Sequence, residues 1–240
     1  QQLPSITIVE EKIKGKGAAL RAGYKAAQGD ILVVIDADGS NDPRELPRFV
    51  EALLQGADFV KGSRFAPGGG TTDMPRFRKL GNGAFVLMTN LLFGVSFTDL
   101  CYGYHAFWRY CLDSINLENV NGFEIDTSLY LDAVLSRLRI LEVPSFEGYR
   151  FHGVGQLQTI PDGTRVLTTI LTKWFSAIHN RNNNLFLGFR GNTRAFSRLS
   201  GAESWMDASP SVVGANQRFM QLLSSMLLGQ RDVRDLFDRT

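Results

Sequence analysis

The sequence has few of the residues that would place it in a specialised class of protein. Among its 240 residues are two cysteines, Cys101 and Cys111, and three histidines. Two cysteines are too few for a disulfide framework and lack a metal-type spacing, which indicates a reducing compartment. No apolar run approaches the roughly 18 residues that a membrane-spanning helix needs. The net charge is only +2, so the composition gives no reason to expect nucleic acid as a partner.

What remains is the composition of an ordinary globular protein. Hydrophobic residues make up 44% of the chain and charged residues 21%, enough for a substantial core. From residue 180 onward the composition turns to Asn, Ser, Gly and Arg, with one helical patch near Asn216 to Leu228. We therefore expect one domain over residues 1–179 and a polar extension with a short helix over residues 180–240.

Apolar segments alternate with helix-forming segments along the first 60 residues. Ile31 to Ile35 is a continuous apolar run, which is typical of a strand buried on both faces. Asp42, Pro43 and Glu45 then form the pattern of a helix N-terminus with a capping box. Short connections between strand, helix and strand predict a parallel sheet with right-handed crossovers. The expected strands are 5–10, 31–35 and 57–63, and the expected helices are 17–28 and 42–56.

The second part of the chain is less regular. A glycine- and arginine-rich loop is expected over 64–79, helices over 80–92 and 122–138, and strands within 98–109 and 139–144. The segment 163–178 has an amphipathic helical pattern, with Val166, Ile170 and Trp174 on its apolar face. This face fits a lipid interface, and it equally fits packing on the sheet or on a partner helix.

Two aspartates, Asp36 and Asp38, stand directly after the strand predicted at 31–35. The carboxyl ends of strands form the ligand-binding edge of an open parallel sheet, and residues i and i+2 of a strand share a face. Two carboxylates held close repel each other, and Mg²⁺ or Mn²⁺ would relieve that repulsion and bind the oxygens of a diphosphate. The spacing alone equally fits a pair of solvated turn aspartates.

Two cationic segments favour an anionic ligand. The first is KGKG, residues 14–17, at the start of a predicted helix, although a basic turn explains it as well. The second, residues 61–79, holds five Lys and Arg residues against one acid and surrounds three consecutive glycines. A mobile phosphate-binding loop and a solvated charged face both fit this segment.

Six blocks of sequence, taken in order, resemble the family 2 glycosyltransferases of GT-A fold. The blocks are KGKGAALRAGYKAAQGD, ILVVIDADGSNDP, DFVKGSRF, TDLCYGYHAFWR, GFEID and RILEVPSFEGYRFHG, and they lie between Ser5 and Ile178. The resemblance is greatest to the dolichyl- or polyprenyl-phosphate mannosyltransferase branch. One Asp-x-Asp motif is weak evidence, whereas six blocks in register are specific. The resemblance implies an α/β, Rossmann-like GT-A fold with a mostly parallel sheet flanked by helices.

The resemblance also implies an activity. It is the inverting transfer of a hexose from a nucleotide-diphosphate sugar donor to a polyprenyl (dolichyl-type) lipid phosphate acceptor, by an enzyme peripheral at the cytoplasmic face of a membrane. The residues that match the family's motifs are Asp36 and Asp38 for a metal (Mg²⁺ or Mn²⁺) and catalysis, Lys16, Gly17, Arg64 and Arg150 for the donor, and Arg76 and Arg78 for the acceptor.

The chemistry of the acceptor decides whether a base is needed. A phosphate is already anionic near neutrality, so its attack on the sugar needs no strong general base. A hydroxyl acceptor would need a carboxylate base, for which Glu124 and Asp126 are the catalytic candidates. A capping and surface role at the start of a helix fits these two residues equally well.

The sequence departs from the family pattern at its beginning. Relatives open with a strand of the VVIPAYNE type and a second strand that ends in DDGS, and this chain has neither. We therefore expect an N-terminally incomplete member with reduced donor affinity and an exposed sheet edge. Two other functions remain open, namely transfer to a hydroxyl of a glycan or small molecule, and a non-catalytic binding module.

Overall fold

The computed structural model describes residues 6–72, 74–151, 157–183 and 194–195, which belong to a compact unit spanning residues 1–196. A second unit, residues 197–240, lies outside the described residues, as does the helix predicted near 216–228. The domain boundary at residue 180 therefore stays a prediction.

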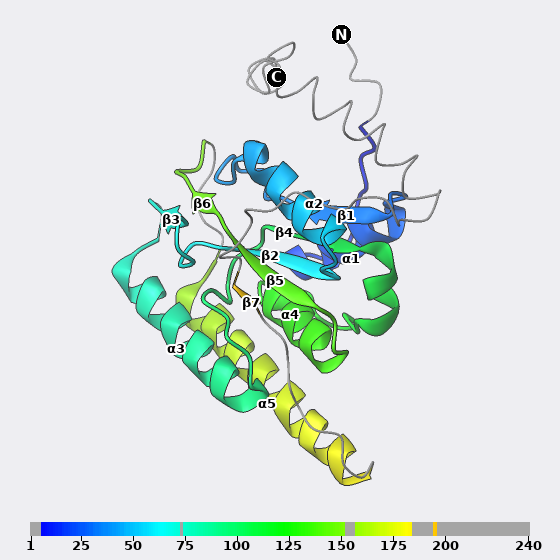
Figure 1. The fold of residues 1–240 in the computed structure, drawn as a ribbon, viewed down its shortest axis with the longest axis vertical. Coiled ribbons are helices and arrows are strands. Elements are labelled where there is room, and N and C mark those ends of the chain that lie inside the picture. Colours follow the sequence, from blue (N-terminus) through cyan, green and yellow to red (C-terminus); the bar gives the residue numbers. More distant parts are fainter. Residues whose placement is uncertain (1–5, 73, 152–156, 184–193, 196–240) are drawn as a thin grey trace. The chain divides into compact units, whose positions relative to one another are not determined.

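Within the described residues, a five-stranded sheet forms the centre of the first unit, in the order β1-β4-β2-β5-β7 (Figure 1). Strands β1, β2, β5 and β7 run parallel to one another, and β4 is antiparallel and lies between β1 and β2. The mostly parallel sheet is confirmed, with one inserted strand that the pattern of short crossovers did not predict. The strands are β1 (Ile31–Val34), β2 (Phe59–Ser63), β4 (His105–Trp108), β5 (Ile140–Pro144) and β7 (Arg194–Ala195).

Helices cover both faces of this sheet. On one face, Phe49 and Leu53 of α2 pack against Val60 and Tyr104. On the other, α1, α4 and α5 contribute to a larger cluster around Phe59. Figure 1 shows α2 on one side of the sheet and α4 with α5 on the other. The helices are α1 (Lys16–Ala26), α2 (Leu46–Leu54), α3 (Arg76–Phe93), α4 (Ile125–Leu135) and α5 (Thr159–Asn183), with 3₁₀ turns η1 (Pro43–Glu45) and η2 (Arg109–Ser114).

Two expectations about the first strands are wrong. Residues 6–10 form no strand, and Ile6 and Ile8 are exposed. An alternating sequence becomes a strand only where a neighbouring strand takes up its backbone hydrogen bonds, and the described residues supply none at this position. Strand β1 is not buried on both faces either, because only Leu32 and Val34 are buried while Ile31 and Val33 are half-buried.

The capping box at the next helix is half confirmed. Asp42 accepts a hydrogen bond from the backbone amide of Arg44, as an N-cap does. Glu45 does not reach back to Asp42. It accepts instead from Ser145 Oγ at 2.5 Å and from the Phe146 amide at 3.1 Å, which ties η1 to the end of β5.

Helix α3 begins four residues earlier than predicted, so Arg76 and Arg78 are helical rather than in a loop. Pro75 is the N-cap and has extended backbone angles. Its missing amide hydrogen is tolerated there, because the N-cap precedes the residues whose amides bond within the helix. The preceding loop contains β3 (Gly70–Thr71), which pairs with β6 (Phe146–Glu147) in a separate two-stranded sheet.

The apolar face of α5 packs within the protein. Val166 is 5% exposed, Ile170 is fully buried, and Trp174 packs against the main core. Lys173 Nζ lies 2.5 Å from Asp132 Oδ1 on α4. Of the two alternatives for this segment, the structure bears out packing for the face around Val166 and Ile170. None of the helices in the described ranges is long and apolar enough to cross a membrane.

Candidate functional site

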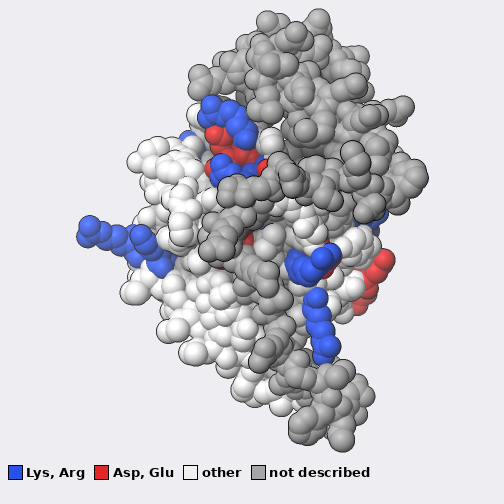
Figure 2. All heavy atoms as spheres, in the orientation of Figure 1, with Lys and Arg blue, Asp and Glu red and all other residues white. Residues whose placement is uncertain are grey.

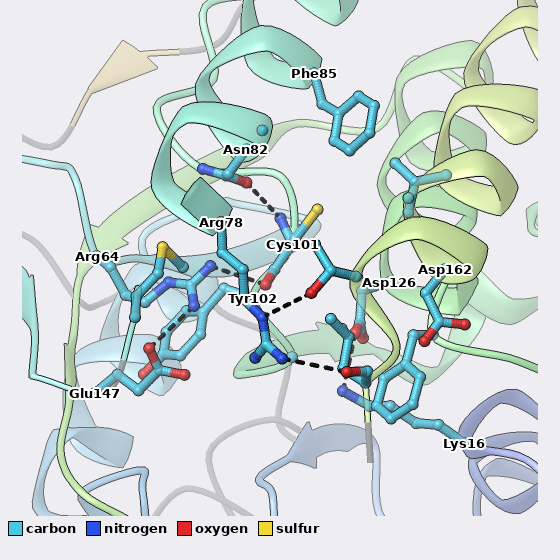
Figure 3. Close-up of a pocket in the computed structure, with 18 of the residues that line it drawn as sticks. Lys16, Arg64, Arg78, Asn82, Phe85, Cys101, Tyr102, Asp126, Glu147 and Asp162 are labelled. Atoms are coloured by element: carbon cyan, nitrogen blue, oxygen red, sulfur yellow. Dashed lines mark hydrogen bonds and ion pairs between the residues drawn. The ribbon is translucent and has the colours of Figure 1, made fainter. Parts of the chain in front are cut away.

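A cavity of about 690 Å³ opens at the carboxyl edge of the sheet (Figure 3). Asp36 and Asp38 follow β1, Arg64 follows β2, and Glu147 lies on β6 just beyond β5. Together with Lys16 at the start of α1, Asp126 at the start of α4, and Arg150, they form the polar wall of the cavity. Helices α3 and α5 form an opposite, apolar wall.

Lys16 lies between two carboxylates of the polar wall. Its Nζ donates to Asp126 Oδ2 at 2.9 Å and lies 3.4 Å from Asp36 Oδ1. Burial opposes the charge of Lys16, but the two carboxylates outweigh burial and raise the pKa of the ammonium. Burial, only partly offset by Lys16, raises the pKa of Asp36, and the negative charges of Asp126 and Asp38 add to that rise.

Asp38 is bonded through both carboxylate oxygens. Oδ1 accepts from the Ser40 amide at 3.0 Å and from Ser40 Oγ at 2.7 Å, and Oδ2 accepts from Arg150 Nε at 2.9 Å. Burial would raise the pKa of Asp38, but the hydrogen bonds from Ser40 and the charge of Arg150 lower it. Asp38 is therefore an ionised carboxylate at neutral pH, already positioned beside a cation.

The Arg64 guanidinium is hydrogen-bonded to three other residues. Its guanidinium makes two hydrogen bonds to Asp99, of 2.7 and 3.0 Å, one of 3.0 Å to Glu147 and one of 2.8 Å to the Cys101 carbonyl. It also stacks 4.7 Å from the ring centre of Tyr102. Arg64 lines the cavity but is only 5% exposed, so this geometry supports a role in holding the wall rather than in binding a donor.

Arg78 joins the two helices of the apolar wall. It donates to the Leu157 carbonyl at 3.2 Å and to Thr159 Oγ1 at 3.4 Å, which links the first turn of α3 to the start of α5. The remaining lining from α3 and α5 is mostly apolar, with Asn82, Asp162 and Thr164 as polar exceptions. The apolar wall consists of Met74, Phe77, Phe85, Leu157, Ile160, Val166 and Leu167.

Three of the predicted site residues lie outside this cavity. Gly17 packs against backbone, because a Cβ there would lie 2.3 Å from the Val120 carbonyl oxygen. Glu124 Oε1 accepts from the Gly122 amide at 3.0 Å. Arg76 is exposed and borders a shallow groove on another side of α3. Asp36, Asp38, Lys16, Arg64, Arg78, Asp126 and Arg150 are brought together.

The sequence analysis missed several cavity residues. Asn82 is buried on α3, where its Oδ1 accepts from the amides of Leu100 and Cys101. An amide side chain among the small and apolar residues that follow the first turn of the helix was the available signal. Glu147 and Asp162 had no distinguishing sequence pattern, and only the fold places them in the lining.

The residues present fit a divalent cation in part. Asp36 and Asp38 offer the hard oxygen ligands that Mg²⁺ and Mn²⁺ prefer, and Mg²⁺ commonly binds through one or two carboxylates plus substrate phosphates. In the described ranges, no three His, Cys, Asp or Glu side chains are grouped to hold a metal. Two aspartates would therefore hold such an ion together with the oxygens of a ligand.

The chain resembles a class of known enzymes in both sequence and fold. Residues 1–115 match the family model described as glycosyl transferase family 2. A crystal structure of glucosyl-3-phosphoglycerate synthase from Mycobacterium tuberculosis with phosphoglyceric acid matches at a TM-score of 0.52 and 26% identity, over 72% of this chain and 58% of that chain. Another structure of that enzyme, with Mn²⁺, uridine diphosphate and glucosyl-3-phosphoglycerate, matches at 0.51 over the same shares. The GT-A fold and the resemblance to family 2 are confirmed.

Several curated relatives are named as mannosyltransferases or monophosphomannose synthases of lipid phosphates. The chain is 38% identical to undecaprenyl-phosphate mannosyltransferase of Micrococcus luteus over 59% of this chain and 60% of that protein. It is 34% identical to polyprenol monophosphomannose synthase of Mycolicibacterium smegmatis (60% and 56%) and 31% identical to dolichol-phosphate mannosyltransferase of Pyrococcus furiosus (65% and 44%). The chain thus spans 44–60% of the length of these relatives. The resemblance to the polyprenyl-phosphate mannosyltransferase branch is confirmed as well.

Proposed function

We propose that the protein is an inverting glycosyltransferase that moves a hexose from a nucleotide-diphosphate sugar to a polyprenyl phosphate. The observation that carries the proposal is the division of one cavity into two walls. The polar wall holds Asp36, Asp38 and Arg150, which suit a metal-bound diphosphate. The apolar wall between α3 and α5 suits the hydrocarbon part of a lipid acceptor.

The residues of the two walls have separate tasks in this reaction. Asp36 and Asp38 would hold Mg²⁺ or Mn²⁺, which supplies charge stabilisation for the departing diphosphate. Arg150, held by Asp38, adds a fixed positive charge at the same place. Arg78 lines the same cavity from the first turn of α3 and would position the acceptor phosphate. Packing of the prenyl chain on the apolar wall excludes water from the anomeric carbon.

The experiment is a transfer assay with the full chain. Labelled GDP-mannose and UDP-glucose are offered in turn with polyprenyl phosphate and Mn²⁺, and labelled lipid is extracted. We expect lipid-linked hexose from one donor and a loss of about 100-fold in Asp38→Asn. Asp42→Asn is the matched control, since Asn caps a helix as well as Asp does. The proposal fails if neither donor yields product, or if both variants behave alike.

One carboxylate oxygen favours a second function, which is transfer to a hydroxyl acceptor. Asp126 Oδ1 is buried and has no hydrogen-bond partner in the described part of the chain, and Asp126 lines the cavity. A free carboxylate oxygen there suits a general base for a hydroxyl acceptor. Transfer to glycerol-type or sugar hydroxyls that is lost in Asp126→Asn, with no transfer to lipid phosphate, would select this function.

Contact with a membrane surface belongs to the proposal, and α3 is the element that favours it. Leu80, Leu87 and Leu91 are 74%, 62% and 75% exposed and, with exposed Ala84, form a stripe at helical spacing, here called the α3 stripe. The helix contains no acidic residue and has three cations in its first turn. Cations at a helix N-terminus oppose the helix dipole, so an outside anion such as a phospholipid headgroup explains them better than helix stability does. Figure 2 shows an uncharged surface over α3 with Lys or Arg at its N-terminal end.

A further inference from the structure

The polar wall already contains a cation of its own. Lys16 Nζ lies 2.9 Å from Asp126 Oδ2 and 3.4 Å from Asp36 Oδ1, and the Lys16 side chain is 16% exposed. Salt and water screen such a partly buried group weakly. The ammonium therefore already neutralises part of the negative charge that Asp36 would offer a metal ion.

The backbone at two glycines, Gly17 and Gly103, determines where the Lys16 side chain lies. The amide of the following residue, Gly17, donates to the Asn121 carbonyl at 2.8 Å, which fixes the start of α1. On the other side, a Cβ at Gly103 would lie 2.4 Å from Lys16 Nζ and 3.2 Å from Asp36 Oδ2. The absence of a side chain at Gly103 leaves room for the ammonium between its partners.

Asp126 gives an independent indication that the site is incomplete without a ligand. It is 5% exposed, and while Oδ2 accepts from Lys16, Oδ1 has no partner among the described residues. A buried, unsatisfied carboxylate oxygen costs free energy. A cation that lies in the cavity would reduce that cost.

We propose that Lys16 is a resident cation, anchored by Asp126, that competes with the divalent metal for Asp36. The inference rests on the proposed function, because it assumes that the metal binds at Asp36 and Asp38. A divalent ion held by Asp36 would be repelled by the ammonium that lies 3.4 Å from Asp36 Oδ1, and it would have to share this carboxylate with Lys16. As a consequence, the protein alone binds metal weakly, and binding becomes strong only when a diphosphate adds its own oxygens.

The test is a calorimetric titration of the full chain with Mn²⁺ alone. Lys16→Gln removes the charge but keeps an amide that can donate to Asp126. We expect the dissociation constant to fall at least tenfold, or binding to become measurable where the wild type shows none. Lys14→Gln is the matched control, because Lys14 is exposed and the change in net charge is the same. Unchanged or weaker Mn²⁺ binding in Lys16→Gln overturns the inference.

Two further variants keep the test decisive. If Lys16→Gln does not fold, Lys16→Met, which removes the charge and keeps a long unbranched side chain, takes its place, and it too must bind Mn²⁺ more tightly than the wild type. Equal or weaker binding overturns the inference. Asp36→Asn separates this inference from the proposed function. If Asp36→Asn leaves both Mn²⁺ binding and the gain in Lys16→Gln unchanged, the metal site lies elsewhere, and both the proposed function and the role of Lys16 fail. If Asp36→Asn abolishes Mn²⁺ binding but Lys16→Gln gives no gain, only the role of Lys16 is refuted.

Discussion

At the scale of single residues, the cavity depends on charges that the protein neutralises internally. Asp99 is fully buried and bonds to Arg64, which in turn holds Glu147. Lys61 is also fully buried, 2.5 Å from Glu142 Oε1. Removing one partner from such a pair leaves the other charge buried and unpaired, which is far more costly than losing an exposed pair.

Asp99→Asn is therefore expected to lower the free energy of unfolding by about 3 kcal/mol. Burial would raise the pKa of Asp99, but Arg64 and Lys61 lower it. Because the folded-state pKa lies below the unfolded value of about 3.9, this contribution is present above about pH 4 and is lost as the pH falls through the folded-state pKa. Urea unfolding at pH 7 and below pH 4 measures both effects. The exposed carboxylate Asp113 provides the control, and Asp113→Asn should be near neutral. Equal stability of the two variants would contradict the assignment.

At the scale of elements, the position of α1 depends on how closely its first turn approaches residues 120 and 121. A Cβ at Gly17 would lie 2.3 Å from the Val120 carbonyl oxygen, and one at Gly15, where φ is 135°, would lie 2.1 Å from the Asn121 carbonyl oxygen. Arg21 adds hydrogen bonds to Val120 O and Asn121 Oδ1. The glycines of KGKG thus serve packing, and that packing places Lys16 in the polar wall.

Gly17→Ala is expected to destabilise the protein by about 1–3 kcal/mol, because the backbone oxygen of Val120 cannot move far. Gly23→Ala, in the same helix, is the matched control. A Cβ at Gly23 would meet nothing within 4 Å, so this change should stabilise by about 0.5–1 kcal/mol. Thermal unfolding of the two variants should therefore show shifts of opposite sign, and shifts of the same sign would refute the close approach.

Elements were predictable where local sequence determines them, and not where distant partners do. The helices at α1, α2 and α4 and the strands β1, β2 and β5 follow from apolar runs and Gly or Pro boundaries. The insertion of β4 between β1 and β2 depends on pairing between residues more than 40 positions apart, such as Phe59 with Phe107. In the site, Asp36 and Asp38 were predictable from their position after a strand. The contact of Lys16 with Asp126 joins residues 110 positions apart, and no local pattern contains it.

At the scale of the whole molecule, the question is which surface would meet a lipid. The amphipathic pattern of α5 predicted one candidate, but its buried residues pack on the protein. The α3 stripe remains exposed, and it lies on the helix whose other side, at Phe77, Gly81 and Phe85, lines the apolar wall of the cavity. A lipid acceptor held at the α3 stripe would therefore need only to pass around one helix to reach the polar wall.

Replacing Leu80, Leu87 and Leu91 together with Ser should abolish binding to vesicles that contain anionic phospholipid. Each leucine that enters the interface contributes up to about 1.5 kcal/mol, so the triple change should weaken binding more than 100-fold in cosedimentation. The three side chains are 62–75% exposed, so the free energy of unfolding should change little.

Phe175→Ser tests the alternative surface, because Phe175 is an exposed aromatic residue on α5, 60% accessible. Binding that survives the triple change but is lost in Phe175→Ser would assign the membrane contact to α5 instead. If neither the triple change nor Phe175→Ser affects vesicle binding, neither helix makes the membrane contact. The transfer assay with a soluble short-chain acceptor would still test the cavity independently.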